Sequence, residues 1–212
     1  MKIFVVGGSG RVASELIKLL AGEGHQVIAG SRHPENIVQL SGVTAINLDL
    51  HASVDDIANL MKDSNVVYFV AGSRGKDLLQ TDAMGAVKTM KAAAKNNIKR
   101  YILLSSIGAL QPEKWADFGL PDSLTNYQIA KFFADNYLVS NTQLDYTIIQ
   151  PTNLLEEAGT GKVTFGEIDH KVNPIPDVAK VLADCLKYDN TIGKVIMMST
   201  GNTPIEQAMQ TV

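Results

Sequence analysis

The feature of this sequence that most constrains its fold is the glycine-rich stretch GGSGRVA at residues 7–13. The apolar run KIFVV (2–6) precedes it, and a stretch with apolar residues at helical spacing (12–24) follows it. Glycine has no Cβ, so it lets the chain turn sharply and lets a second group approach the backbone closely. A strand, a glycine turn and a helix in direct succession are typical of a parallel α/β fold.

The spacing of the small residues in this turn fits a dinucleotide-binding fingerprint. Gly8-x-Gly10-x-x-Ala13 satisfies the pattern, and because Gly7 is also a glycine, Gly7-x-x-Gly10-x-x-Ala13 satisfies it equally well. The helix that follows would offer free N–H groups and the positive end of its dipole to a pyrophosphate. The alternative is a tight turn without a ligand. A second strand within about thirty residues favours the dinucleotide site.

Short β-rich runs alternate with longer helical patterns over residues 1–150, which predicts an α/β fold with a doubly wound, parallel, Rossmann-like sheet. Several runs are apolar without alternation, as expected for strands covered by helices on both faces. The expected strands are KIFVV (2–6), QVIAG (26–30), VTAINL (43–48), NVVYFVA (65–71), RYILLS (100–105) and DYTIIQ (145–150). The expected helices are 12–24, 53–63, 82–97 and 125–141.

The regular alternation of strand and helix patterns ends at residue 151. Loops with short strands come first, including EIDHKVNPIP, and then a helical pattern (176–188) and a late strand (194–199). We expect one domain over 1–212. Its last part, 151–212, is too short for an independent domain and reads as a small add-on that packs over the carboxyl edge of the sheet, on the substrate side.

Charge and hydropathy give no reason to expect nucleic acid or a membrane as partner. The 212 residues are 45% hydrophobic and 19% charged, with a formal net charge of −3. A mildly acidic balance does not attract polyanions, and no apolar run approaches the length that spans a bilayer. The first residues read as a strand rather than as a secretory signal. We expect a small-molecule substrate, and the helices could also support a homodimer.

The single cysteine, Cys185, cannot form an internal disulfide and lies on the apolar face of its predicted helix. It fits a core position in a protein of the reducing cytoplasm. The four histidines, His25, His33, His51 and His170, fall in separate predicted loops without paired ligand spacing. We therefore expect no metal site.

The end of the second strand favours NADP(H) over NAD(H). A site for NAD usually has an acidic residue there, which binds the ribose 2′-hydroxyl, whereas an arginine suits the 2′-phosphate of NADP. This chain has Ser31 and Arg32 at that place and no carboxylate. A guanidinium can hold a phosphate through two hydrogen bonds, and a hydroxyl can add a third. The alternative is a solvated loop arginine.

A tyrosine and a lysine four residues apart on a predicted helix form the candidate catalytic pair. Tyr127 and Lys131 point the same way at this spacing. A phenol is a poor base at neutral pH, and a neighbouring ammonium favours its ionised form. The preceding strand ends in Ser105 and Ser106, at the edge where α/β sheets place ligands, so that a hydroxyl there could bind a substrate carbonyl.

This order of motifs resembles the short-chain dehydrogenase/reductase superfamily. The similarity covers essentially the whole chain and is closest to its atypical and extended branch, compact NAD(P)H-binding proteins related to sugar epimerases, biliverdin-IXβ/flavin reductases and nitrogen-metabolite-repression regulators. The segments that carry it are GGSGRVA (7–13), LDL (48–50), VAGS (70–73), TDAMGAVKTMKAAAKNNIKRYILLSS (81–106), IIQPTNL (148–154) and PDVAKVLADCL (176–186).

The resemblance implies a role for each matching residue. Ser106 (or Ser105) would polarise a carbonyl, Tyr127 would exchange a proton with its oxygen, and Lys131 would tune Tyr127 and hold the nicotinamide ribose. Asp49 and Leu50 would lie against adenine, and the loop 70–73 beside a cofactor ribose. The residues expected at the cofactor are Gly7, Gly8, Ser9, Gly10, Arg11, Val12, Ser31, Arg32, Asp49, Leu50, Ala71, Gly72, Ser73, Ser105, Lys131, Pro151 and Asn153.

Two departures from the family pattern keep alternatives open. Gln150 and Thr152 stand where the branch often has Arg and Gly, and Lys88 stands where extended enzymes often have Asn. The resemblance implies an NADP(H)-dependent oxidoreductase acting on a small carbonyl, quinone or flavin-like substrate. The alternatives are a non-catalytic NADP(H)-sensing regulatory protein and an epimerase-like enzyme.

The long segment 108–123 lies between the serine strand and the Tyr–Lys helix. Its aromatic residues, Trp115 and Phe118, fit either of two structures. One is a lid over substrate, and the other is simple packing against the 151–212 segment.

Overall fold

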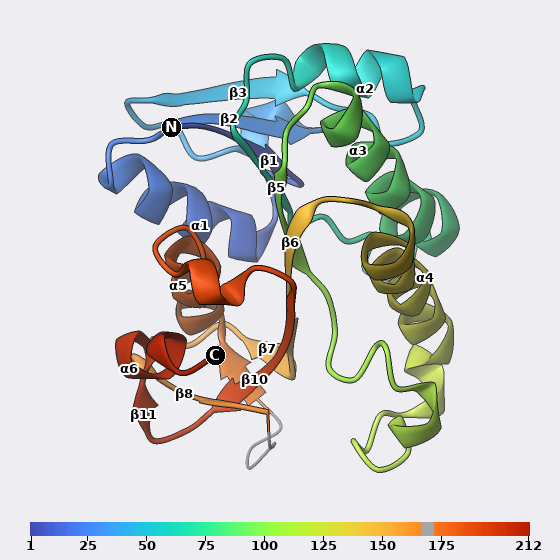
Figure 1. The fold of residues 1–212 in the computed structure, drawn as a ribbon, viewed down its shortest axis with the longest axis vertical. Coiled ribbons are helices and arrows are strands. Elements are labelled where there is room, and N and C mark those ends of the chain that lie inside the picture. Colours follow the sequence, from blue (N-terminus) through green and yellow to red (C-terminus); the bar gives the residue numbers. More distant parts are fainter. Residues whose placement is uncertain (167–171) are drawn as a thin grey trace.

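The computed structural model describes residues 1–166 and 172–212 and shows a mostly parallel sheet between two layers of helices (Figure 1). The strand order is β11-β8-β10-β6-β5-β4-β1-β2-β3. The strands are β1 (Lys2–Val6), β2 (Gln26–Ser31), β3 (Val43–Asn47), β4 (Val66–Phe69), β5 (Arg100–Leu104), β6 (Asp145–Pro151), β7 (Asn153–Leu155), β8 (Lys162–Phe165), β9 (Val172–Pro174), β10 (Lys194–Thr200) and β11 (Thr203–Pro204). The predicted doubly wound α/β fold is confirmed.

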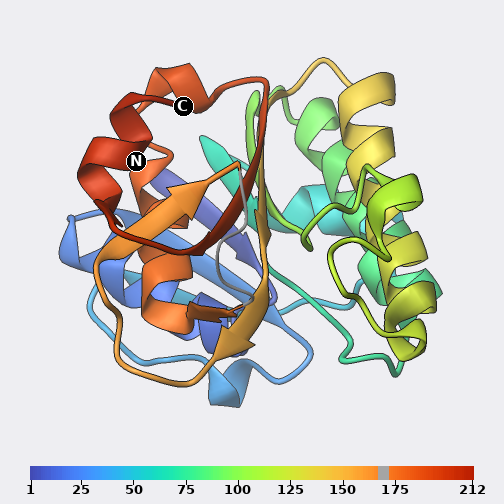
Figure 2. The ribbon, with the colours of Figure 1, turned by 90° about the horizontal axis from the view of Figure 1, so that it is seen from below.

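The helices cover both faces of this sheet, as Figures 1 and 2 show from two directions. On one side lie α1 (Arg11–Gly22), α5 (Ile175–Asp184) and α6 (Ile205–Gln210), and on the other α2 (Val54–Leu60), α3 (Met84–Lys95) and α4 (Thr125–Asn141). Successive β1 residues alternate between the two cores: Ile3 packs with α1, and Phe4 with α2 and α3. This alternation explains why the central strands are apolar throughout.

The crossover within the sheet determines where a ligand can bind. From β1 the chain adds β2 and β3 toward one edge of the sheet, and it then returns to the other side of β1 and adds β4, β5 and β6 toward the opposite edge. The direction in which strands are added therefore reverses between β1 and β4. In open α/β sheets the crevice for a ligand lies at the carboxyl ends of the strands at such a reversal. The glycine turn follows β1 at this point, and the segment 70–73 follows β4.

The predicted elements agree with the structure to within a few residues. The helix expected at 125–141 is α4. The helix expected at 82–97 starts at Met84 and is preceded by a π-helical turn, Leu78–Ala83, which the sequence pattern did not reveal. The strand expected at 65–71 is shorter, Val66–Phe69, because the chain leaves the sheet to border the crevice.

Much of the segment 151–212 continues the sheet rather than covering its edge. Strand β10 pairs in parallel with β6, and β8 and β11 add antiparallel strands beyond it. The β7–β9 pair forms a separate two-stranded sheet that begins directly after β6, and α5 packs against α1. Of the stretch EIDHKVNPIP, residues 167–171, His170 among them, lie outside the described residues. Cys185 is buried in the core, as predicted.

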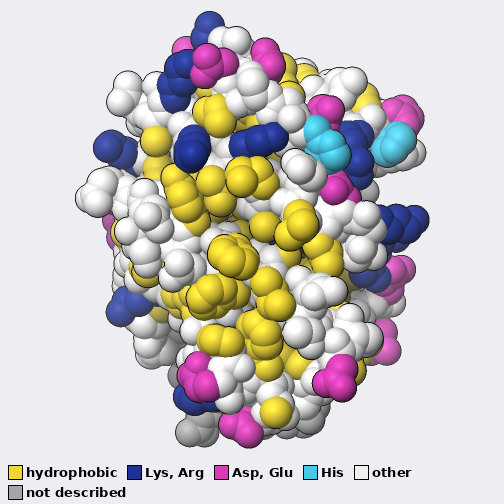
Figure 3. Space-filling model, turned by 90° about the vertical axis from the view of Figure 1, so that its right-hand side faces the viewer, with side chains coloured by type: hydrophobic (Ala, Val, Ile, Leu, Met, Phe, Trp, Pro, Cys, Tyr) yellow, Lys and Arg dark blue, Asp and Glu magenta, His cyan; other side chains and the backbone are white. Residues whose placement is uncertain are grey.

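The outer face of α3 and α4 carries a group of exposed apolar side chains, visible in the space-filling view (Figure 3). Its exposed members are Met84, Ile129 and Phe133, together with Leu79 from the π-helical turn before α3. Both charged residues of α4, Lys131 and Asp135, are buried on the opposite side of that helix. None of the described helices is long and apolar enough to cross a bilayer.

Candidate functional site

A pocket of about 980 Å³ opens at the reversal point of the sheet. Its walls come from the glycine turn after β1, the ends of β2, β4, β5 and β6, the start of α4 and the strand β7. A volume of this size accommodates a large organic ligand. Of the residues expected at the site, those that line it are Gly7, Ser9, Gly10, Arg11, Val12, Ser31, Arg32, Leu50, Ala71, Gly72, Ser105, Ser106, Tyr127, Lys131, Pro151 and Asn153.

The glycine turn has room for backbone but not for side chains. Gly7 has a φ of +88°, and a Cβ on it would lie 2.5 Å from the Cα of Ala71. A Cβ on Gly8 would lie 2.9 Å from the Cβ of Ala29, so this second glycine lets the turn sit tightly on β2. A Cβ on Gly10 would lie 3.1 Å from the carbonyl oxygen of Gly7. The turn therefore brings the start of α1 close to the pocket.

Within the described residues, no side chain caps the N-terminus of α1. Its N-cap residue, Gly10, makes no side-chain capping bond, and the first turn holds no acidic residue. Uncapped N–H groups and the positive end of the helix dipole favour a phosphate. The hydroxyls of Ser9 and Ser31 lie 2.6 Å apart and join the glycine turn to the end of β2.

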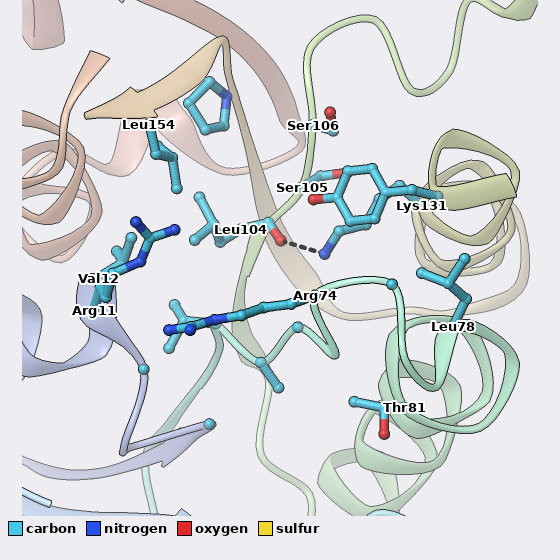
Figure 4. A pocket seen from close by; sticks show the side chains of 18 of the residues that line it. Arg11, Val12, Arg74, Leu78, Thr81, Leu104, Ser105, Ser106, Lys131 and Leu154 are labelled. Carbon is cyan, nitrogen blue, oxygen red and sulfur yellow. Dashed lines mark hydrogen bonds between the residues drawn. The ribbon is translucent and has the colours of Figure 1, made fainter. Parts of the chain in front are cut away.

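Four cationic side chains line the pocket, and no carboxylate is among the described lining residues. They are Arg11, Arg32, Arg74 and Lys131. Figure 4 shows Arg74 reaching across the pocket toward Arg11 and Val12. Arg11 donates to Glu156 over 2.6 Å, and both side chains are largely exposed, so this ion pair can open at little cost. The lining suits a ligand with several negative charges.

These residues fit a dinucleotide cofactor. The glycine cradle that a Cβ would fill, the uncapped start of α1 and the arginines would hold a pyrophosphate and, at Arg32, a further phosphate. Leu48 and Leu50 line the pocket beyond the end of β3 and offer an apolar surface for a base. The arrangement therefore offers partners for the phosphates and for one base of such a cofactor.

Tyr127 and Lys131 lie side by side in the wall of the pocket that α4 provides. Tyr127 is half-buried, and the ammonium of Lys131 lies 5.6 Å from the centre of its ring. Lys131 Nζ donates to the carbonyl oxygen of Leu104 over 3.2 Å, which fixes the side chain at the end of β5 (Figure 4). The phenol faces the open pocket, as proton exchange with a ligand requires.

The two candidate serines have different surroundings. Ser106 is partly exposed to the pocket, whereas the side chain of Ser105 is buried. The hydroxyl oxygen of Ser105 has no hydrogen-bond partner among the described residues. Ser106 is therefore the better placed of the two for a substrate carbonyl.

A buried carboxyl group, Asp135, lies one helical turn beyond Lys131. Its Oδ2 accepts a hydrogen bond of 2.8 Å from Gln150 Nε2. Burial raises the pKa of Asp135 to about 6, against the opposing effects of Ser105, Gln150 and the charge of Lys131. Since the folded state holds this proton more tightly than the unfolded chain, the carboxyl increasingly destabilises the fold as pH rises from about 4 to 6.

Three residues expected at the cofactor do not line the pocket. Gly8 packs on β2, and Asp49 turns its carboxylate to the backbone N–H of His51. The backbone N–H of Ser73 donates to the buried Asp82, which holds the loop after β4. Lys88, which stands where extended enzymes often have Asn, donates to the carbonyls of Leu50 and His51, outside the pocket.

Several lining residues were not expected from the sequence. Arg74 follows the segment 70–73 directly, and its positive φ of 53° turns the chain there. An arginine beside a glycine at a strand end is the signal that could have revealed it. The other unexpected side chains at the pocket include Leu78, Thr81, Leu120, Ser123, Leu124, Asn126 and Leu154.

The segment 108–123 only partly resembles a lid. Leu120 and Ser123 line the pocket. Trp115 donates from Nε1 to the carbonyl oxygen of Gly108, and the ring of Phe118 lies against Gly108, so both aromatic residues fold back on their own segment. This segment therefore shapes the pocket entrance through its aliphatic and hydroxyl residues.

Comparison with known proteins agrees with this geometry. A family model described as NAD(P)H-binding matches residues 7–189. The chain belongs to this NAD(P)H-binding family. The protein named "Uncharacterized sugar epimerase YhfK" of Bacillus subtilis is 33% identical, over 99% of both chains. The crystal structure of the oxidoreductase ylbE from Lactococcus lactis is 44% identical, with a TM-score of 0.96 over 100% of this chain and 96% of that one.

A more distant structure shares the fold. A short-chain dehydrogenase/reductase from Veillonella parvula, solved in complex with NADP, has a TM-score of 0.78 at 19% identity over 96% of each chain. At this identity the likeness shows a common fold, which is consistent with the expected resemblance to the short-chain dehydrogenase/reductase superfamily. The chain is a member of the NAD(P)H-binding family, and its relatives include proteins named as a sugar epimerase and as an oxidoreductase.

Proposed function

We propose that the chain is an NADP(H)-dependent oxidoreductase that transfers a hydride to or from a small carbonyl, quinone or flavin-like substrate. The observation that carries the proposal is that Ser106, Tyr127 and Lys131 line the same pocket as the glycine turn and the start of α1. The distance of 5.6 Å between Lys131 Nζ and the ring of Tyr127 supports a coupled pair. The Lactococcus lactis relative is named an oxidoreductase.

Each side chain has a distinct role in the reduction of a carbonyl. Ser106 donates a hydrogen bond to the carbonyl oxygen, and Tyr127 gives its proton to that oxygen as the carbon accepts a hydride. Lys131 lowers the cost of the negative charge left on Tyr127. NADPH, held by the glycine turn and the start of α1, would supply the hydride and would thereby be oxidised to NADP⁺. In the oxidation direction the same groups take the proton from an alcohol.

The polarity of the pocket favours this reaction over sugar-nucleotide epimerisation. Beyond Tyr127, the start of α4 and the preceding residues contribute Leu120, Leu124 and Asn126 to the lining, without a charged side chain. A substrate carrying its own pyrophosphate would need cations there, and the three arginines belong to the turns after β1, β2 and β4. The name of the Bacillus subtilis relative, a sugar epimerase, is the observation that favours the epimerase-like alternative.

The proposed preference for NADP(H) depends on Arg32. Replacing Arg32 with alanine should weaken NADPH binding by roughly 10- to 100-fold, because hydrogen bonds to a charged group are lost. NADH binding should change little. The affinities are measured by cofactor fluorescence on wild type, Arg32→Ala and Lys18→Ala, an exposed residue of α1 that loses the same charge outside the pocket. An unchanged ratio of NADPH to NADH affinity in Arg32→Ala would contradict the role of this residue.

Turnover is tested by following NADPH consumption with aromatic aldehydes, quinones and flavins as acceptors. We expect reduction of at least one of these classes. Cofactor binding without turnover of any of them would favour the NADP(H)-sensing alternative. Because Cys185 is a free, buried cysteine, we propose the reducing cytoplasm as the compartment. For a homodimer, the apolar face around Ile129 and Phe133 is the proposed contact surface.

A further inference from the structure

Three polar residues lie on successive turns of one face of α4. Tyr127, Lys131 and Asp135 are spaced four residues apart, so their side chains are neighbours. Their burial increases along the helix: Tyr127 is half-buried at the pocket, Lys131 is 3% exposed and Asp135 is fully buried. A buried carboxyl group therefore lies directly behind the proposed catalytic pair.

Asp135 is held in place by the neighbouring strand β6. Gln150 is also buried, and its Nε2 donates to Asp135 Oδ2 over 2.8 Å. The other oxygen, Oδ1, and the hydroxyl of Ser105 are both buried without a hydrogen-bond partner in the described chain. A buried carboxylate with few hydrogen bonds acts strongly on nearby charges.

The charged groups on the elements around Asp135 have other contacts. Asp82, from the π-helical turn that packs on α4, accepts from the backbone of Ser73. Lys91, from α3, lies over the ring of Tyr137. The remaining charged groups on these elements are Asp77, Lys88, Lys95, Arg100, Asp122 and Asp145, which contact other residues or lie at exposed ends. Lys131 is therefore the charge that Asp135 acts on.

We propose that Asp135, fixed by Gln150, is a positioning residue that keeps Lys131 protonated and so controls how readily Tyr127 releases its proton. The inference rests on the proposed function for its kinetic consequence, but its structural part can be measured without turnover. It also gives Gln150 a role. This residue departs from the family pattern and lies behind the pocket wall, in contact with Asp135.

The sign of the effect follows from simple electrostatics. A carboxylate stabilises a nearby ammonium and destabilises a nearby phenolate. Removing the carboxylate charge should therefore make Lys131 lose its proton at lower pH, and should make Tyr127 ionise at lower pH as well. Carbonyl reduction needs the protonated phenol, so both effects move the alkaline limb of the rate profile to lower pH.

The first experiment follows Lys131 directly by NMR of protein labelled with ¹³C at lysine Cε, with the signal assigned by its loss in Lys131→Arg. In Asp135→Asn, which keeps the shape and can still accept from Gln150, the midpoint of the Lys131 titration should move to lower pH than in wild type. Asp184→Asn is the matched control, because it removes another buried carboxyl, which lies at the end of α5 and pairs with Lys180 and Lys187. Equal midpoints in wild type and Asp135→Asn, or an equal shift in Asp184→Asn, would overturn the proposal.

A second variant guards against misfolding of the first. Gln150→Met removes the amide donor but keeps the volume, so Asp135 should hold its proton to higher pH, which NMR of the Asp135 carboxyl carbon reports. An unchanged Asp135 titration in a folded Gln150→Met protein would count against the proposal. With an aldehyde that the protein reduces, the alkaline limb of the pH profile of kcat should also move to lower pH in Asp135→Asn. Failure to find any turnover would remove the proposed reaction but would leave the titration result standing.

Discussion

Replacing Tyr127 with phenylalanine should lower kcat for the reduction of an aromatic aldehyde by roughly 10²- to 10⁴-fold, the range that general acid catalysis contributes. The reason is that the phenol is the proton donor that faces the pocket, and phenylalanine keeps the ring but not the hydroxyl. NADPH binding should stay within a few-fold of wild type. The measurement is steady-state kinetics together with a separate NADPH titration of the same variant.

Tyr137→Phe is the matched control for this prediction. Tyr137 lies on the same helix, with Lys91 over its ring, outside the pocket. Its hydroxyl should be dispensable for turnover. Equal rates for Tyr127→Phe and wild type would mean that another group supplies the proton, and the assignment of Tyr127 would then be wrong.

Replacing Gly7 with alanine should have the largest effect on the fold and on cofactor binding together. Its φ of +88° costs an alanine about 1–2 kcal/mol, and the added Cβ would meet backbone atoms of Ala71 at 2.5 Å. Relief of this contact must move the turn or the end of β4. We expect a loss of roughly 2–5 kcal/mol in the free energy of unfolding, measured by urea denaturation. NADPH binding should weaken at least tenfold.

Gly24→Ala separates the two causes. Gly24 has a similar φ of +80°, and a Cβ on it would meet nothing within 4 Å. This variant should lose only the backbone cost of about 1–2 kcal/mol and should bind NADPH like wild type. If Gly7→Ala is no less stable than Gly24→Ala and binds NADPH normally, the close approach of the turn to Ala71 is unimportant.

The sequence allowed most of the fold to be predicted because local patterns and global topology agree in this chain. Apolar strand runs, helix-length patterns and the glycine turn each pointed to the same architecture. The π-helical turn Leu78–Ala83 was missed, since nothing in its residues separates it from an ordinary helix start. The course of β10 alongside β6 was also missed, because pairing between distant strands leaves little local trace in the sequence.

The candidate site was predictable where it depends on motifs and less so where it depends on packing. The glycine turn, Tyr127 and Lys131 all line the pocket. Asp49 and Ser73 lie next to lining residues but turn toward backbone partners. A shift of one position in a loop is enough to move a side chain out of a pocket. No sequence pattern determines which way a side chain in such a loop points.

The role of Gln150 shows the same limit. From the sequence, this departure from the family pattern kept the alternative functions open. In the structure, Gln150 is buried against Asp135, while Pro151 and Thr152 line the pocket. The change at Gln150 therefore concerns the polar group behind Lys131, whereas the change at Thr152 lies on the surface of the pocket.

The most direct test of the account is a calorimetric titration of the wild-type protein with NADPH and then with NADH. The account predicts saturable binding of one NADPH per chain, at least tenfold tighter than NADH, which corresponds to about 1.4 kcal/mol. If neither cofactor binds at concentrations up to about 1 mM, a dissociation free energy of roughly 4 kcal/mol, the pocket is not a dinucleotide site. The proposed reaction would then be wrong.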